Sequence, residues 1–229
     1  MKHTVLALDT STEMCSVALR VGNQWAQRSM LAPREHSQKI LTLIDEVLAE
    51  FELGLADVEQ LVVGHGPGSF TGVRIGVSVA QGLAFSQNLP VVAVSTLAAL
   101  AQQAIRLHDA KTIVSAIDAR MNEVYVAVYH NQAGLAKPTL APQMASLTAL
   151  AQQPWWPAGP VTAVGTGWQA YGEILAAGAS VQILDDVTLP LAEDMIRLAD
   201  AGLPAVDAAD LEPLYVRNEV TWKKLPGRE

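Results

Sequence analysis

The order of the apolar segments limits most strongly what this chain can fold into. Three short segments come first: the unbroken apolar run Val5–Leu8, the partly alternating segment Cys15–Val21, and Gln24–Met30, which follows the tight-turn dipeptide Gly22-Asn23. Polar turns join them, at residues 9–12 and 22–23, and short apolar runs bounded by such turns predict strands. The first thirty residues therefore predict a meander of three antiparallel strands.

After residue 31 the pattern changes to an alternation of helices and strands. The apolar residues of Ser37–Phe51 recur with helical spacing. Two further helices are expected at 72–86 and 95–107, the last with Ser95 as its N-cap, and two strands at 61–63 and 91–94. A meander succeeded by alternating helices and strands predicts a mixed α/β sheet flanked by helices.

A second unit with the same opening begins near Lys111. A strand at Ile113–Ile117, a turn at Asp118–Asn122 and a returning strand at Glu123–Tyr129 repeat the order seen around Asp9. We therefore expect two units, residues 1–108 and residues 109–229, with the C-terminal tail returning to the first.

The remainder of the second unit shows less regular patterns. Five prolines in residues 131–162 predict loops with one short helix, and a further strand is expected to end at 164–168. A last helix is expected at Leu191–Ala201, ended by Gly202 and Pro204.

Composition excludes several classes of protein. With 15 Lys and Arg against 23 Asp and Glu, the net charge of −8 argues against a broad nucleic-acid-binding surface. The single cysteine, Cys15, excludes an intrachain disulfide and a multi-thiolate metal site. No apolar run approaches the roughly 18 residues that span a bilayer, so a cytoplasmic protein without membrane contact is expected.

Asp9 and Asp118 each come directly after an apolar strand and are candidates for chemistry. Two carboxylates facing each other across a cleft are able to hold a hydrated metal ion at a phosphate group. Aspartate also commonly caps its own turn. The pattern leaves both interpretations open.

The glycine-rich segment Gly64–Gly72 invites comparison with phosphate-binding loops. It lacks the Gly-Lys-Ser/Thr of a P-loop, and its glycine spacing misses the dinucleotide fingerprint by one residue. A strand-to-helix turn of this kind either presents backbone N–H groups to an anion or allows close helix–sheet packing.

Small residues mark the helix after this loop. Gly72, Gly76 and Ala80 lie four apart on one face, and Ser78 and Gly82 on a neighbouring one. Each interior glycine costs roughly 1 kcal/mol relative to alanine, so such a face implies close approach by another element. That element is either the chain's own sheet or a partner helix.

Signatures of metal and hydrolase chemistry are lacking. The five histidines are at least 22 positions apart, so there is no local metal-binding pair, and Gly-x-Ser-x-Gly is absent.

Several segments together resemble the TsaB family, also called YeaZ. The residues that carry this resemblance extend over essentially the whole chain: Leu6–Thr12, Arg34–Ser37, Gly66–Gly76, Ile117–Arg120, Tyr215–Asn218 and Trp222–Gly227. The resemblance implies an actin/Hsp70-like ATPase (ASKHA) fold of two RNase H-like lobes. It also implies a role in forming N6-threonylcarbamoyladenosine at position 37 of tRNAs that read ANN codons.

In that family the chemistry belongs to a related protein, TsaD, and the P-loop ATPase TsaE joins the complex. Thr96 and Leu100 stand where TsaD has two metal-binding histidines, and a leucine has no lone pair to offer a metal. Residues 118–122 stand where TsaD has a glycine-rich phosphate loop. The resemblance thus implies a noncatalytic copy without cofactor or metal, which binds TsaD and meets tRNA only through the complex.

The resemblance also implies where TsaD binds. In the family the two helices of the first lobe form the pairing surface, and the expected interface residues are Ser37, Ile40, Leu41, Ile44, Gly72, Val73, Gly76, Val79 and Ala80. The same face is expected to support a homodimer when TsaD is missing, and Gly76→Leu to abolish pairing without affecting the fold.

The competing hypothesis is an enzyme, either a small actin-like ATPase or a sugar kinase, with Asp9 and Asp118 around a magnesium-bound nucleotide. A peptidase is a third hypothesis, and the missing metal pair argues against it.

Overall fold

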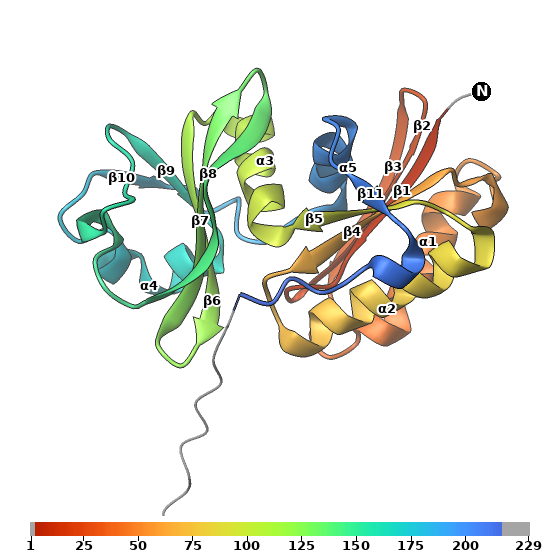
Figure 1. The fold of residues 1–229 in the computed structure, drawn as a ribbon, viewed down its shortest axis with the longest axis horizontal. Helices are drawn as coiled ribbons and strands as arrows, with labels where there is room; N and C mark the ends of the chain where they lie inside the picture. The colour runs from red at the N-terminus through yellow and green to blue at the C-terminus, as the bar shows by residue number, and fades with distance from the viewer. Residues whose placement is uncertain (1–2, 217–229) are drawn as a thin grey trace, which may run out of the picture.

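The computed structural model describes residues 3–216, which contain two mixed β-sheets (Figure 1). The first sheet has six strands in the order β11-β5-β4-β1-β2-β3. Its strands are β1 (Thr4–Asp9), β2 (Met14–Val21), β3 (Gln24–Leu31), β4 (Gln60–Gly66), β5 (Val91–Ser95) and β11 (Ala205–Val206). The helices packed on it are α1 (His36–Ala49), α2 (Phe70–Gln87), α3 (Thr96–His108) and α5 (Ala192–Asp200), with short 3₁₀ turns η1 (Leu55–Asp57) and η3 (Ala208–Asp210).

The second sheet has five strands in the order β10-β9-β6-β7-β8. Its strands are β6 (Thr112–Arg120), β7 (Glu123–Gln132), β8 (Leu135–Ser146), β9 (Val161–Val164) and β10 (Val181–Ile183). Helix α4 (Thr166–Leu175) and the 3₁₀ turn η2 (Leu150–Gln152) belong to the same half of the molecule.

Both sheets are connected in the same way. In the first, β1 pairs with β2 antiparallel and with β4 parallel, and in the second β6 pairs likewise with β7 and β9. The strand–turn–strand pattern that occurs twice in the sequence thus corresponds to a topology that occurs twice in the structure. The structure confirms the predicted fold class of two mixed sheets flanked by helices.

The layers result from strands that bury both of their faces. In β1, Val5 and Ala7 belong to one buried cluster, whereas Leu6 and Leu8 belong to another. Helices α1 and α2 cover the face of Leu6 and Leu8, and α3 and α5 lie between the two sheets (Figure 1). Alternate residues of a strand point to opposite faces, so a continuous apolar run is what a doubly covered strand requires.

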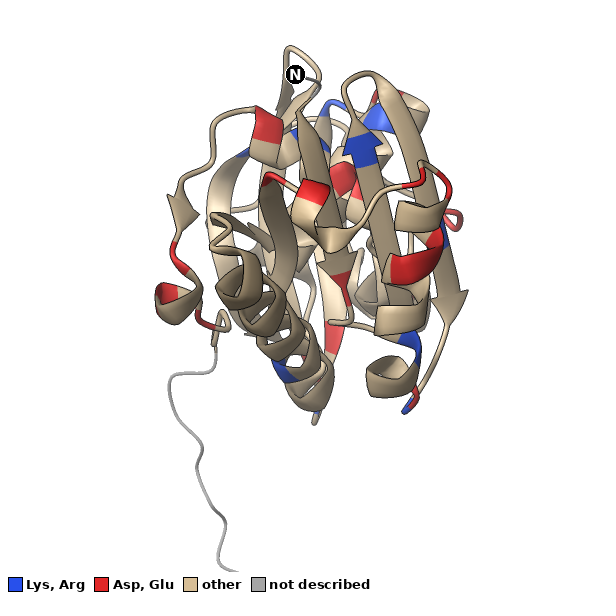
Figure 2. Ribbon diagram, turned by 90° about the vertical axis from the view of Figure 1, so that its right-hand side faces the viewer, with Lys and Arg blue, Asp and Glu red and all other residues tan. Residues whose placement is uncertain are grey.

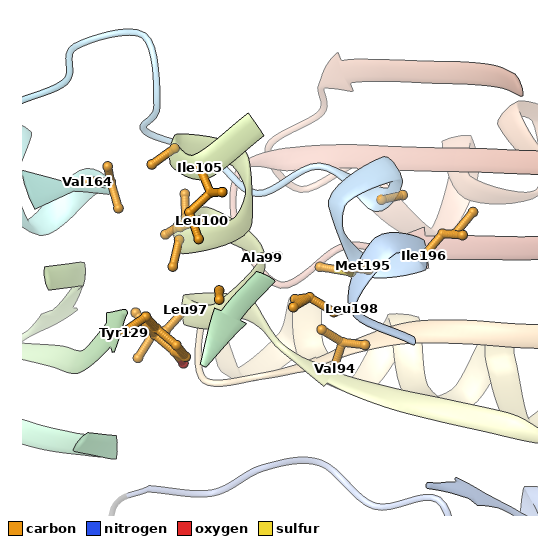
Figure 3. Close-up of a cluster of buried hydrophobic side chains, with 14 of the residues drawn as sticks. Val94, Leu97, Ala99, Leu100, Ile105, Tyr129, Val164, Met195, Ile196 and Leu198 are labelled. Carbon is orange, nitrogen blue, oxygen red and sulfur yellow. The ribbon is translucent and has the colours of Figure 1, made fainter. Parts of the chain in front are cut away.

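One hydrophobic cluster joins the two halves of the molecule. Figure 3 shows Leu97 and Leu100 of α3 toward Tyr129 and Val164 of the second sheet, while Met195 of α5 lies on the other side. Since these side chains are almost wholly buried, the two halves pack against each other through a common hydrophobic core and are not joined by the connecting chain alone.

Residues 131–162, expected to be looped, contain the 12-residue strand β8. It forms the edge of the second sheet and pairs only with β7, so Pro138 and Pro142 are tolerated there without breaking a central ladder. The loop prediction was wrong because proline was taken as a strand breaker at an edge position.

Three shorter elements were not expected. Helix α4 begins soon after Val164, and the strands β10 and β11 are only three and two residues long. Ser95 occupies the N-cap position of α3 as expected, but its side chain makes no capping hydrogen bond.

The C-terminal residues of the described chain return to the first sheet, where α5 packs and β11 pairs with β5. The division into domains between residues 108 and 109 stays a prediction. The basic segment 222–228 lies outside the described residues.

Two features of the described residues bear on partners. None of the helices within residues 3–216 is long and apolar enough to cross a bilayer. Figure 2 shows acidic residues on many elements and basic residues at separated points rather than in a stripe.

Candidate functional site

A cleft of about 1350 Å³ lies between the two halves of the molecule. The β1–β2 turn and the start of α2 form one wall, and the β6–β7 turn and the start of α4 form the other. Its lining includes Ser11, Thr12, Glu13, Leu31, Pro67, Phe70, Arg74, Asp118, Arg120, Tyr125, Thr166, Gln169, Ala170, Leu189, Leu214, Tyr215 and Val216. Asp118 therefore faces the cleft, whereas Asp9 does not line it.

Asp9 ends β1 and is completely buried. Its Oδ1 accepts a hydrogen bond from the backbone N–H of Ser11 (3.3 Å), and its Oδ2 has no partner among the described residues. Because burial penalises the charged form, the pKa of this carboxyl is raised to about 7. Burial and the nearby Asp9 together raise the pKa of the Cys15 thiol to about 11.

The glycine-rich loop packs against this same turn. A Cβ at Gly72 would stand 2.2 Å from the carbonyl oxygen of Thr10, and one at Gly68 would stand 2.2 Å from that of Ser11. Backbone contacts of this kind leave no space for a side chain.

Two of the N–H groups of this loop have partners within the chain. Ser69 N donates to Ser11 O (2.8 Å), and Gly72 N donates to Ser69 Oγ (3.3 Å), which caps α2. These contacts match the close-packing interpretation of the loop rather than that of an anion cradle.

The expected turn at residues 118–122 begins only after Arg120, because β6 extends to that residue. The end of β6 is polar and faces the cleft. Asp118 accepts hydrogen bonds from Arg120, at the backbone N (2.8 Å) and at Nη1 (3.1 Å), and from Tyr171 Oη (3.5 Å). Arg120 Nη2 also lies 3.7 Å from Glu13 Oε1 on the opposite wall. A guanidinium between two carboxylates thus stands where the two turns meet.

The two positions where the resemblance places metal ligands in TsaD are buried here. Thr96 Oγ1 donates to Ser11 Oγ (3.0 Å), and Leu100 belongs to the shared core. Residues 3–216 contain no group of three or more His, Cys, Asp or Glu side chains able to hold a metal ion.

The predicted set of interface residues stays a prediction, and the structure shows how accessible each of its members is. Six of the nine are buried within the chain: Ile40, Ile44, Gly72, Val73, Gly76 and Ala80. Only Ser37 and Leu41 are exposed, and Val79 is half-buried. The small-residue face of Gly72, Gly76 and Ala80 packs on the chain's own β1 turn and sheet, so the open choice between own sheet and partner is decided for the sheet.

The contacts of Gly76 argue against the expectation that Gly76→Leu leaves the fold intact. A Cβ at Gly76 would stand 2.8 Å from Thr10 Oγ1, and Thr10 is itself wholly buried.

The neighbouring face of α2 is the accessible one. Ser78 is exposed, a Cβ at Gly82 would meet nothing within 4 Å, and Phe85 is 84% exposed. A small groove of about 190 Å³ runs beside it, lined by Leu41, Ile44, Asp45, Leu48, Ala49, Leu53, Gly54, Leu55 and Leu83. The spacing of Ser78 and Gly82 was visible in the sequence, but which face the sheet covers was not.

Comparison with known proteins places these features in a family. The sequence model of the family described as "TsaD: tRNA N6-adenosine threonylcarbamoyltransferase" matches residues 30–202. A Haemophilus influenzae protein named tRNA threonylcarbamoyladenosine biosynthesis protein TsaB is 44% identical over 99% of this chain and 98% of its own length. The Escherichia coli protein of the same name is 42% identical, over 98% and 99%.

A solved structure shows the same fold over almost the whole chain. The structure described as YeaZ from Pseudomonas aeruginosa superposes with a TM-score of 0.85 at 40% identity, covering 93% of this chain and 99% of that one.

Proposed function

Since this chain belongs to the TsaB family of tRNA threonylcarbamoyladenosine biosynthesis proteins, we propose that it acts in that biosynthesis as a noncatalytic subunit. In this proposal it binds and activates a TsaD transferase in the cytoplasm. TsaE and tRNA reach it only within the resulting complex, and the surface that binds TsaD supports a homodimer when TsaD is missing.

The interlobe cleft supports a noncatalytic role. The β1–β2 turn contributes Glu13 and the end of β6 contributes Asp118, and the guanidinium of Arg120 is already paired with both carboxylates. Carboxylates at this point repel the phosphates of a nucleotide, which disfavours the kinase hypothesis. Leu100 and the hydrogen-bonded Thr96 offer no pair of metal ligands at the bottom of the first lobe.

The outer face of α1 and α2 is the observation that carries the scaffold proposal. Leu41 of α1 and Phe85 of α2 are large apolar side chains exposed there, and a Cβ at Gly82 of α2 would enter open space. A glycine in an exposed helix destabilises it by roughly 1 kcal/mol, and close approach by another helix is what offsets that cost. We therefore assign the partner interface to this outer face instead of to the buried small-residue face.

The test is Gly82→Leu in the full chain, mixed with its cognate TsaD and analysed by size-exclusion chromatography with light scattering. The wild type is expected to form a 1:1 complex, and Gly82→Leu to weaken it at least about tenfold, equivalent to about 1.4 kcal/mol. The fold should survive because the new side chain enters open space.

Ala201→Leu is the matched control, since Ala201 is exposed at the end of α5, on the opposite face of the first sheet. It should pair like the wild type. A Gly82→Leu chain that pairs normally would remove the interface from this face, and a wild type that ignores TsaD at micromolar concentration would overturn the scaffold role itself.

A further inference from the structure

The mouth of the interlobe cleft carries exposed apolar side chains that the proposed function does not use. Leu31, Phe70 and Tyr215 line the cleft, with exposed fractions of 63%, 70% and 54%. Large apolar side chains gathered at one opening mark a binding surface more often than chance exposure.

The chain itself runs into this opening. Gln81 Nε2 donates to the carbonyl oxygen of Leu211 (3.0 Å), and the backbone N–H of Leu214 donates to that of His65 (2.8 Å). The ring of Tyr215 then lies 5.1 Å from the guanidinium carbon of Arg74. Leu214, Tyr215 and Val216 line the cleft, so the last described residues lie on its wall.

The sequence beyond residue 216 differs from the rest in charge. Residues 217–229 contain four basic and two acidic side chains, whereas residues 1–216 contain 11 basic and 21 acidic ones, a net charge of −10. The basic residues are interleaved with apolar ones, in Trp222-Lys223-Lys224-Leu225-Pro226.

The cleft lining is balanced in charge, and the acidic excess belongs to the body around it. The carboxylates of the lining are Glu13 and Asp118, and its guanidiniums are those of Arg74 and Arg120. The guanidinium of Arg74 lies over the ring of Phe70 (3.3 Å to the centroid), and Arg120 pairs with both carboxylates. Apolar walls and an acidic body therefore favour a segment that is itself apolar and basic.

We propose that this cleft binds the chain's own C-terminal segment, residues 217–229. Thirteen residues, when fully extended, reach at most roughly 43–47 Å. A segment tethered at the cleft wall has an effective concentration in the millimolar range, so weak contacts suffice to hold it. The bound segment fills the volume in which a small ligand would otherwise sit.

The test is hydrogen exchange, read by mass spectrometry on the peptide covering residues 217–229 in the full chain without TsaD. The wild type is expected to show exchange about tenfold slower than the same peptide alone, equivalent to about 90% occupancy. Trp222→Ala should remove this protection from the segment side. Ala170→Trp, which puts a large ring on the cleft wall, should remove it from the other.

Ile174→Trp is the matched control, because Ile174 is exposed on the same helix but does not line the cleft. It should keep wild-type protection. Exchange at the rate of the free peptide in the wild type, or protection that survives both Trp222→Ala and Ala170→Trp, would overturn the proposal. Protection that appears only at concentrations where the chain self-associates would place the segment on a second copy and also overturn it. None of these outcomes depends on pairing with TsaD.

Discussion

The two halves of the molecule have the same strand order but differ in the elements that come after the meander. In the first, α1 lies between β3 and β4, whereas in the second only the 3₁₀ turn η2 lies between β8 and β9. The first sheet thus carries a pair of helices on its outer face where the second carries α4 alone. The two halves thus keep the same sheet topology and differ in their helices. Only the first half has a two-helix outer face that could bind a partner.

The two hairpin turns show the same divergence at the level of single residues. Asp9 is completely buried, whereas Asp118 faces the cleft and pairs with Arg120. In both halves a glycine packs closely on the first hairpin of the sheet. A Cβ at Gly165 would meet the carbonyl oxygen of Ala116 within β6, and one at Gly72 would meet that of Thr10 just after β1. Both halves therefore have a helix packed closely on the first hairpin of the sheet. They differ in the aspartate at the end of the first strand, which is buried in one half and faces the cleft in the other.

The most severe way to break the first half is Gly72→Leu. Its side chain would collide with the backbone of Thr10, which cannot move without disrupting β1. We expect a loss of about 5 kcal/mol or failure to fold, measured by urea unfolding monitored by circular dichroism. Gly82→Leu, on the open face of the same helix, should unfold near the wild-type midpoint. Equal midpoints for both variants would contradict the assignment of covered and open faces.

The next prediction compares the two aspartates. The folded-state pKa of Asp9 is about 7, above its usual value of 3.8, so the folded protein binds an extra proton between these pH values. The stability from this group is therefore complete below about pH 4 and falls as pH rises to 7, by about 4 kcal/mol.

Asp9→Asn should flatten this dependence and make the chain more stable than the wild type at pH 8. The measurement is urea unfolding from pH 5 to pH 8, where the two curves should diverge with rising pH. Asp118→Asn should keep the wild-type slope because Asp9 is still present. A parallel pair of curves for wild type and Asp9→Asn would show that Asp9 does not carry the effect.

The smallest expected effect concerns the contact between the halves. The Arg120–Glu13 pair spans the cleft at 3.7 Å, and both side chains are more than half exposed. Exposed pairs of this kind contribute about 0.2–1 kcal/mol, so Arg120→Ala should shift the unfolding midpoint only slightly. Small-angle scattering checks whether the cleft opens. An unchanged scattering curve is expected, because the core shared through α3 and α5 holds the halves.

Much of the fold could be predicted from the sequence, because the local pattern of apolar residues indicates which faces of a strand or helix are buried. The unbroken apolar run of Val5–Leu8 predicted a strand covered on both sides, and the spacing after Ser37 predicted α1. The prolines of β8 misled because whether a strand lies at an edge depends on what pairs beside it.

The candidate site was only partly readable. Asp9 and Asp118 stand out equally in the sequence, yet one is buried and the other lines the cleft. Gly76 and Gly82 likewise mark two faces of one helix, and nothing local says which of them the sheet covers.

The sequence by itself determined the repeated strand order, the family and the presence of a helix with two small-residue faces. The tertiary structure alone decided that the face of Gly72 and Gly76 packs on the turn after β1, and that the face of Gly82 stays open. The physical reason is that the periodicity of a sequence shows which residues lie on the same face of a helix or strand. Burial, and with it a raised pKa or an available surface, depends on elements distant in the chain that come to lie against them.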